Sequence, residues 1–254
     1  NAEYDIGVVG VQAIILVEDS VRFYSSYLPN IYKIILQQSM GFMQEGLNDH
    51  QKMLRMRGRA KILLATTFEE AIYLYEKYYH NLNGIITDMS YPQNGVMNPM
   101  AGLNLAKRIK ADYKYMPILI QSSDNKNEAL AKGIRVGFIN KNSKTLSIEL
   151  RDFIKNYFAF GDFIFVNPHN QQEDDRAADL KSLQHRIWHI PDESLKYHLG
   201  RDHISKWLNS RAIFPLAKLF RQFTPEDFND LDALRRFIHD SIAAYRITKG
   251  RGII

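Results

Sequence analysis

Five short apolar segments, each followed by a segment with helix-like spacing of apolar residues, set the strongest constraint on the fold of this chain. The apolar segments lie at residues 13–17, 61–65, 84–87, 117–121 and 136–140. Each has the length of a buried strand. Parallel strands need a crossover connection, which is usually a helix. The alternation therefore predicts a doubly wound α/β domain around a five-stranded parallel sheet, for which we expect the order 2-1-3-4-5.

The pattern changes after Phe160. Residues 162–166 are compatible with one more strand, and the residues that follow are polar and rich in turn formers, as in a linker. From residue 176 the apolar residues follow helical spacing, and prolines interrupt them. We therefore expect an α/β domain over residues 1–160, a linker over 161–175, and a small all-helical domain over 176–254.

Composition narrows the class of protein. The chain has 254 residues, of which 45% are hydrophobic and 24% charged, as in a globular protein. It contains no cysteine, which excludes disulfides and thiolate metal sites and favours a cytoplasmic location. The longest apolar stretch, residues 6–17, is too short to span a bilayer and lacks the basic flank of a signal peptide. The net charge of +5 permits contact with nucleic acid without requiring it.

Polar side chains stand at the carboxyl ends of the predicted strands. Glu18 and Asp19 follow the first strand, and Asp88 ends the third. In an open parallel sheet of the expected order, these strand ends border one crevice, where ligands bind. Three carboxylates in one pocket repel one another unless a cation is present. Because Mg²⁺ prefers carboxylate, carbonyl and water oxygens, these residues predict a magnesium site.

Ser122 and Lys141 follow the fourth and fifth strands and add a hydroxyl and an ammonium group to the same edge. This set suits phosphoryl transfer to a carboxylate, in which the cations neutralise the phosphoryl oxygens while Asp88 attacks. Ser122 would then donate to the new phosphate, and Phe138 would move into the space that it leaves. The simpler interpretation of Asp88 is a cap for the following helix.

These residues together resemble the receiver domain of two-component response regulators, over residues 12–158. The motifs that carry the resemblance are Leu16-Val-Glu-Asp-Ser20, Asp88 with Pro92, Pro117 with Ser122, and Phe138-x-x-Lys141. It implies a flavodoxin-like fold, with Asp88 as the phosphoacceptor and Ser122 and Lys141 as its partners. It also implies that Glu18, Asp19, Asp88 and the backbone carbonyl of Ser90 hold Mg²⁺, and that Ser122 and Phe138 form the switch.

The resemblance further implies a sensor histidine kinase or a phosphotransfer protein as the partner, and a signalling domain that is not an enzyme. The chain departs from the family pattern in three places. They are the long helical segment that includes residues 37–57, the extended loop 89–101, and Asn142 where the family usually has proline. The long helical segment also makes a homodimer contact a candidate role for this chain.

The C-terminal part resembles, more loosely, the region that precedes a phosphoenolpyruvate-synthase-like, pyruvate-binding domain in some large bacterial proteins. The segments that carry this likeness are 194–198, 201–203, 207–211 and 246–252. It implies that residues 176–254 are a regulatory or coupling domain and that the chain is a fragment, with a phosphotransferase domain after Ile254.

Two other functions stay open at this stage. The first is a DNA-binding transcriptional regulator, for which the helical part supplies Arg211, Arg235 and Arg236. The second is a receiver-like scaffold that is never phosphorylated and only dimerises. We expect no membrane partner, and nucleic acid is the less favoured partner. Asp88-x-Ser90 also occurs in haloacid-dehalogenase phosphatases, but those enzymes need a second acid at the position of Ser90.

Overall fold

The computed structural model describes residues 2–43 and 58–250. The chain divides into two compact units, residues 1–38 with 59–158 and residues 39–58 with 159–254. Among the described residues, no helix combines the length and the apolar character needed to cross a membrane.

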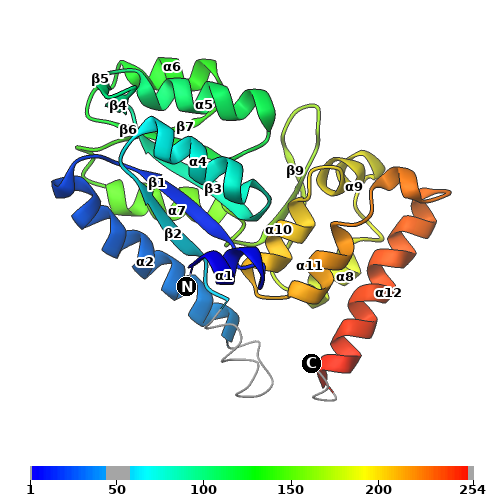
Figure 1. Ribbon diagram of the computed structural model, residues 1–254. Coiled ribbons are helices and arrows are strands. Elements are labelled where there is room, and N and C mark those ends of the chain that lie inside the picture. Colours follow the sequence, from blue (N-terminus) through cyan, green and yellow to red (C-terminus); the bar gives the residue numbers. More distant parts are fainter. Residues whose placement is uncertain (1, 44–57, 251–254) are drawn as a thin grey trace. The chain divides into compact units, whose positions relative to one another are not determined.

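The first unit is built on a five-stranded sheet whose neighbouring strands are all parallel (Figure 1). Its strands are β1 (Ala13–Val17), β2 (Lys61–Ala65), β3 (Leu82–Asp88), β6 (Ile118–Ser122) and β7 (Gly137–Asn140). Their order is β2-β1-β3-β6-β7, which confirms the predicted doubly wound topology. Every residue of β1 is buried, because helices cover both faces of the sheet.

The helices of this unit lie on both sides of the sheet (Figure 1). They are α1 (Ala2–Gly7), α2 (Val21–Met43), α4 (Phe68–Tyr78), the short 3₁₀ helix η1 (Tyr79–Asn81), α5 (Ala101–Asp112), α6 (Asn127–Gly133) and α7 (Leu146–Tyr157). Alternate residues of β1, including Ile15 and Val17, share a core with α4 and α5. Thr67 caps α4, because its side chain accepts a hydrogen bond from the backbone N–H of Glu70.

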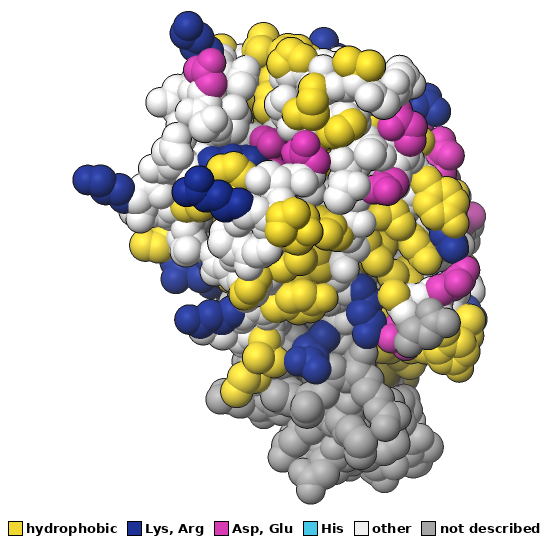
Figure 2. All heavy atoms as spheres, turned by 60° about the vertical axis from the view of Figure 1, so that its left-hand side comes forward, with side chains coloured by type: hydrophobic (Ala, Val, Ile, Leu, Met, Phe, Trp, Pro, Cys, Tyr) yellow, Lys and Arg dark blue, Asp and Glu magenta, His cyan; other side chains and the backbone are white. Residues whose placement is uncertain are grey.

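Helix α2 is apolar on two sides. Its inner side buries Tyr27, Ile31 and Ile35. A second row, with a spacing of four residues, leaves Tyr32 and Leu36 exposed, and Figure 2 shows hydrophobic side chains gathered on this face of the molecule. The helix accounts for the first part of the predicted helical segment 37–57, and residues 44–57 lie outside the described residues.

The segment 89–101, expected as a loop, contains a small antiparallel hairpin of β4 (Tyr91–Gln93) and β5 (Val96–Asn98). Asn94 and Gly95 connect the strands, and both have positive φ angles, of 54° and 75°. Asn-Gly is the pair that such a two-residue turn favours. Tyr91 is fully buried and anchors the hairpin, and its hydroxyl lies 3.2 Å from Thr87 Oγ1.

The second unit is mostly helical and also contains one antiparallel hairpin. Its elements are β8 (Phe163–Val166), β9 (Glu173–Ala177), α8 (Leu180–Arg186), α9 (Asp192–Leu199), α10 (His203–Ser210), α11 (Phe214–Phe220), the 3₁₀ helix η2 (Pro225–Asp227) and α12 (Leu231–Gly250). Part of the segment 161–175, expected as a linker, therefore forms a hairpin. Phe163 and Phe165 share one side of β8 and enter the core with Trp207 and Ile238.

Two histidines form a hydrogen-bonded pair inside this unit. The backbone N–H of Val166 donates to His198 Nε2 at 3.0 Å. A neutral His198 therefore carries its proton on Nδ1, and Nδ1 donates to His203 Nδ1 at 3.0 Å. Burial, followed by the charge of Arg201, lowers the pKa of His198 to about 3. Burial is also the main reason that the pKa of His203 lies well below its ordinary value.

We expect acid to destabilise the second unit. Both histidines stay neutral in the folded unit, whereas the unfolded chain binds a proton at each below about pH 6.5. The free energy of unfolding is therefore highest above that pH and falls below it, by up to about 1.4 kcal/mol per pH unit for each histidine. Urea unfolding between pH 7.5 and 5, followed by tryptophan fluorescence, measures this, because Trp188 and Trp207 both lie in this unit.

The matched variants are His198→Gln and His185→Gln. The first lowers stability at neutral pH and flattens its pH dependence, because a neutral amide replaces the buried imidazole. The second leaves the dependence unchanged, because the His185 side chain is exposed in the folded unit. Equal pH dependence in the parent and in His198→Gln would contradict this account.

Candidate functional site

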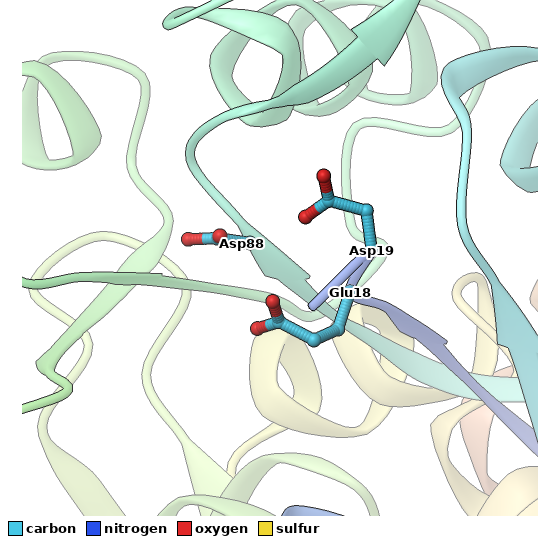
Figure 3. A group of neighbouring side chains, drawn as sticks. All are labelled: Glu18, Asp19 and Asp88. Carbon is cyan, nitrogen blue, oxygen red and sulfur yellow. The ribbon is translucent and has the colours of Figure 1, made fainter. Parts of the chain in front are cut away.

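The carboxyl edge of the sheet brings three carboxyl groups to one place. Glu18 and Asp19 follow β1, and Asp88 ends the neighbouring strand β3. One ligand oxygen from each residue lies within 4.8 Å of the other two, and Figure 3 shows the three groups around a common space. The positions of these residues after the predicted strands predict this cluster, because parallel strands end at the same edge.

Lys141 crosses the edge and joins two of these groups. It follows β7, and its Nζ lies 2.6 Å from Glu18 Oε2 and 2.8 Å from Asp88 Oδ2. Its side chain is only 3% exposed, so the ammonium and its two partners form an ion-paired cluster largely removed from water. Three carboxylates with one ammonium leave an excess of negative charge, which a cation would balance.

Burial is the main cause that raises the pKa of Asp88 above its usual range, and Lys141 opposes it. The pKa of Glu18 is raised in the same way, with burial first and the charge of Asp88 adding to it. The backbone N–H of Met89 donates to Asp88 Oδ1 at 2.7 Å, which fixes the plane of this carboxyl group. Ionisation of these buried carboxyl groups therefore costs free energy, and a bound cation reduces that cost.

The donor set fits a hard divalent cation. Each carboxylate oxygen of Asp88 has one contact and keeps a further lone pair, and Asp19 is half-buried, so water reaches the site. Mg²⁺ takes one or two carboxylates and completes its octahedron with carbonyl oxygens and waters. The residues present therefore suit Mg²⁺, with Asp19 and Asp88 as direct ligands and Glu18 beside them.

A glycine shapes the turn that follows Asp88. The N–H of Gly102, in the first turn of α5, donates to the carbonyl of Met89 at 3.0 Å. A Cβ atom on Gly102 would lie 2.0 Å from the carbonyl oxygen of Asp88. Because no side chain fits there, α5 approaches the backbone of Asp88 closely and fixes the turn that leads to Ser90.

Ser122 lies at the end of β6, buried and held by its own loop. Its Oγ accepts hydrogen bonds from Asn127 Nδ2 at 2.8 Å and from the backbone N–H of Asp124 at 3.1 Å. Its carbonyl accepts from the N–H of Lys141 at 2.9 Å, which ties the ends of β6 and β7 together. Both bonds to Oγ use lone pairs, so the hydroxyl proton is still available for donation.

Phe138 lies on β7, three residues before Lys141, and packs half-buried against the main core of the first unit. The structure thus places it on the element that carries Lys141. Its predicted movement, like the switch role of Ser122, stays a prediction. Lys141 reaches both carboxylates although Asn142 follows it where the family pattern has proline.

Three residues beside the site were not predicted from the sequence. Phe23 lies against the Lys141 ammonium. Tyr27 Oη and Gln121 Nε2 are buried without a hydrogen-bond partner among the described residues. Gln121 pairs in register with Asp88. Burial raises the pKa of Tyr27, and the nearby charges of Glu18 and Asp88 raise it further. One sequence feature could have indicated Phe23 and Tyr27. The helix that contains them begins two residues after Asp19, so its first turns must pass this edge of the sheet.

We expect Tyr27→Phe to raise the free energy of unfolding by about 1 kcal/mol, because a buried hydroxyl without a partner is costly. Tyr91→Phe is the matched control, since that hydroxyl is also buried but bonds to Thr87. It should lower stability by about the same amount. Thermal and urea unfolding of the two variants measure the contrast, and a stability loss in both would contradict the assignment.

We expect Asp88→Asn to raise stability at neutral pH by about 1 kcal/mol, because it removes one charge from an excess of carboxylates. The folded pKa of Asp88 is raised, so this gain is full above that pKa and disappears as pH falls toward about 4. Mg²⁺ should raise the melting temperature of the parent more than that of Asp88→Asn, by mass action.

Asp152→Asn, on the exposed side of α7, is the control for this substitution. It should change neither the stability nor the response to Mg²⁺. An equal response to Mg²⁺ in the parent and in Asp88→Asn would place the cation elsewhere.

No protein-family model and no curated protein matches the chain. Several solved structures that are similar to it are response regulators or their receiver domains. A response regulator receiver domain protein from Clostridium thermocellum shares 16% identity over 58% of this chain and 94% of its own, with a TM-score of 0.40. The CheY4 chemotaxis protein of Vibrio cholerae shares 14% over 55% and 94%, with a TM-score of 0.37. The RcsB response regulator of Salmonella typhimurium shares 15% over 92% and 99%, with a TM-score of 0.37.

Proposed function

We propose that Asp88 accepts a phosphoryl group and that the chain is a response regulator of a phosphorelay signal transduction system. The observation that carries the proposal is the contact of Lys141 Nζ with Glu18 and Asp88, beside Asp19. A carboxylate nucleophile, a buried ammonium and a carboxylate set that suits Mg²⁺ are the parts that phosphoryl transfer needs.

The donor in this proposal is a phosphohistidine of a sensor histidine kinase or a phosphotransfer protein. A carboxylate oxygen of Asp88 attacks the phosphorus, so an O–P bond forms while the P–N bond to the imidazole breaks. The bonding electron pair leaves with the imidazole nitrogen. The leaving group is a neutral imidazole if the other ring nitrogen carries a proton, and otherwise the ring takes a proton from solvent. The product is an acyl phosphate on Asp88, and attack by water on phosphorus later returns the carboxylate and inorganic phosphate.

The other residues of the site have separate roles in this reaction. Asp19, Asp88 and the carbonyl of Ser90, with Glu18 nearby, would hold Mg²⁺, which would supply positive charge to the transferring phosphoryl group. Lys141 moves its N–H donors from the carboxylates to the phosphoryl oxygens. Ser122 donates its hydroxyl proton to a phosphoryl oxygen.

The phosphate adds nearly two negative charges at one edge of the sheet. We propose that Ser122 and the half-buried Phe138 shift together in response and that the change passes to the helical second unit. In this proposal the chain is a phosphoacceptor in signalling and not an enzyme in its own right. A phosphoenolpyruvate-synthase-like domain as the final target, and a homodimer through the exposed row of α2, are further predictions.

Intact mass after incubation with acetyl phosphate and Mg²⁺ tests the proposal. The parent should gain one phosphoryl group, and Asp88→Asn should gain none. Lys141→Gln should react at least about tenfold more slowly, because the buried charge that stabilises the transition state is lost. Asp124→Asn, an exposed acid at the same edge, is the matched control and should react like the parent.

Two outcomes would contradict the proposal. An equal adduct on Asp88→Asn would place the phosphoryl group on another residue. Absence of an adduct on the parent, together with no change in melting temperature on adding fluoroberyllate, would leave the dimerisation scaffold as the better account.

A further inference from the structure

The ring of Phe23 lies against the ammonium group of Lys141. Lys141 Nζ is 4.2 Å from the centre of the ring. The ammonium has three N–H donors, and Glu18 and Asp88 are the two carboxylates that it contacts. The face of an aromatic ring is negatively polarised and attracts a cation, most strongly where water is excluded. Phe23 is therefore a third support for this charge.

The start of α2 holds the ring in place. The N–H of Phe23 donates to the carbonyl of Ser20 at 3.0 Å, in the first turn of the helix. The ring stacks on Tyr27, one turn later, at 6.3 Å between centroids and 23° between planes. Tyr27 is 2% exposed, so its ring is fixed in the core and supports the ring of Phe23.

The residue just before α2 orients Glu18. The backbone N–H of Ser20 donates to Glu18 Oε1 at 3.2 Å, which directs Oε2 of that carboxyl group to Lys141. Residues 18–23, which lead from β1 into the first turn of α2, therefore supply two of the three contacts that the ammonium makes among the described residues, one through a carboxylate and one through a ring. The third contact, Asp88, comes from β3.

A ring differs from a polar partner in one respect that matters for phosphoryl transfer. It attracts the ammonium without offering a lone pair, so it does not compete for the N–H donors. The ammonium can exchange carboxylate oxygens for phosphoryl oxygens while it stays over the ring. A polar side chain at this position would hold one donor and would have to release it.

We propose that Phe23 is a positioning residue that keeps the Lys141 ammonium seated over the site, an inference that rests on the proposed phosphorylation of Asp88. The ring replaces part of the hydration that the buried ammonium has lost. It thereby favours the seated position over one in which the lysine turns toward water. The rate of phosphoryl transfer scales with the fraction of molecules in which the ammonium is seated.

Replacement of Phe23 by mono-, di- and trifluorophenylalanine tests the inference. Each fluorine withdraws charge from the ring face and leaves the shape of the ring almost unchanged. Two quantities are measured: hydrogen exchange of the Lys141 ammonium by nitrogen-15 NMR without phosphate, and the rate of Asp88 phosphorylation by acetyl phosphate with Mg²⁺. Exchange should accelerate with each fluorine, by a total of about fivefold to tenfold, because it follows the small fraction of molecules in which the ammonium has turned toward water. Phosphorylation should slow with each fluorine by a smaller factor, because the two ion pairs keep the ammonium seated in most molecules.

Phe153 provides the matched control. It also stacks on a tyrosine one turn later in its helix, Tyr157, at 4.6 Å between centroids and 30° between planes. The same fluorinated series at Phe153 should change neither quantity. Melting curves for both series show that the variants are folded.

The two measurements separate the inference from the function on which it rests. Exchange could accelerate with fluorine number along the series while the parent protein takes no phosphoryl group. That result would support the role of Phe23 in positioning Lys141 and contradict the proposed function. Exchange that does not change along the Phe23 series would overturn the inference. A change of equal size for every fluorinated ring would also overturn it, because that pattern reports shape and not ring charge.

Discussion

The buried ammonium of Lys141 is the interaction on which the rest of the site depends. A charge this far from water is stable only with close partners of opposite sign, and Glu18 and Asp88 supply them at 2.6 and 2.8 Å. The ammonium in turn allows two carboxylates to lie side by side at the ends of adjacent strands. Their excess charge is what makes the edge attractive to a divalent cation.

The fold supplies this arrangement at several levels. Parallel strands place the three residues of the ion-paired cluster, Glu18, Asp88 and Lys141, at one edge of the sheet. The strand order puts β1 and β3 side by side. Gly102 lets α5 reach the backbone of Asp88, and the first turn of α2 brings Phe23 over the ammonium. Both supports lie in the first turn of a helix that starts at the carboxyl edge of the sheet.

The sheet and the four charged residues of the site, Glu18, Asp19, Asp88 and Lys141, were predicted by sequence reasoning, because strand periodicity and strand ends are local patterns. It missed the β4–β5 hairpin, although Asn94-Gly95 is a turn signal, because prolines on both sides suggested a loop. It also missed β9, where four of five residues are charged and the pairing with β8 overrides weak strand propensity. Phe23 and Lys141 are far apart in the sequence, and His198 and His203 lie on two different helices. Periodicity predicts the face of an element on which a residue lies, but not its side-chain partner.

A structure of the chain with Mg²⁺ and fluoroberyllate tests the central claim most directly, because fluoroberyllate mimics a phosphoryl group on a carboxylate. The account predicts beryllium bound to a carboxylate oxygen of Asp88, the metal on Asp19, Asp88 and the Ser90 carbonyl, and Lys141 Nζ moved from Glu18 to a fluorine. Electron density that shows Lys141 still between Glu18 and Asp88, with no beryllium on Asp88, would contradict it.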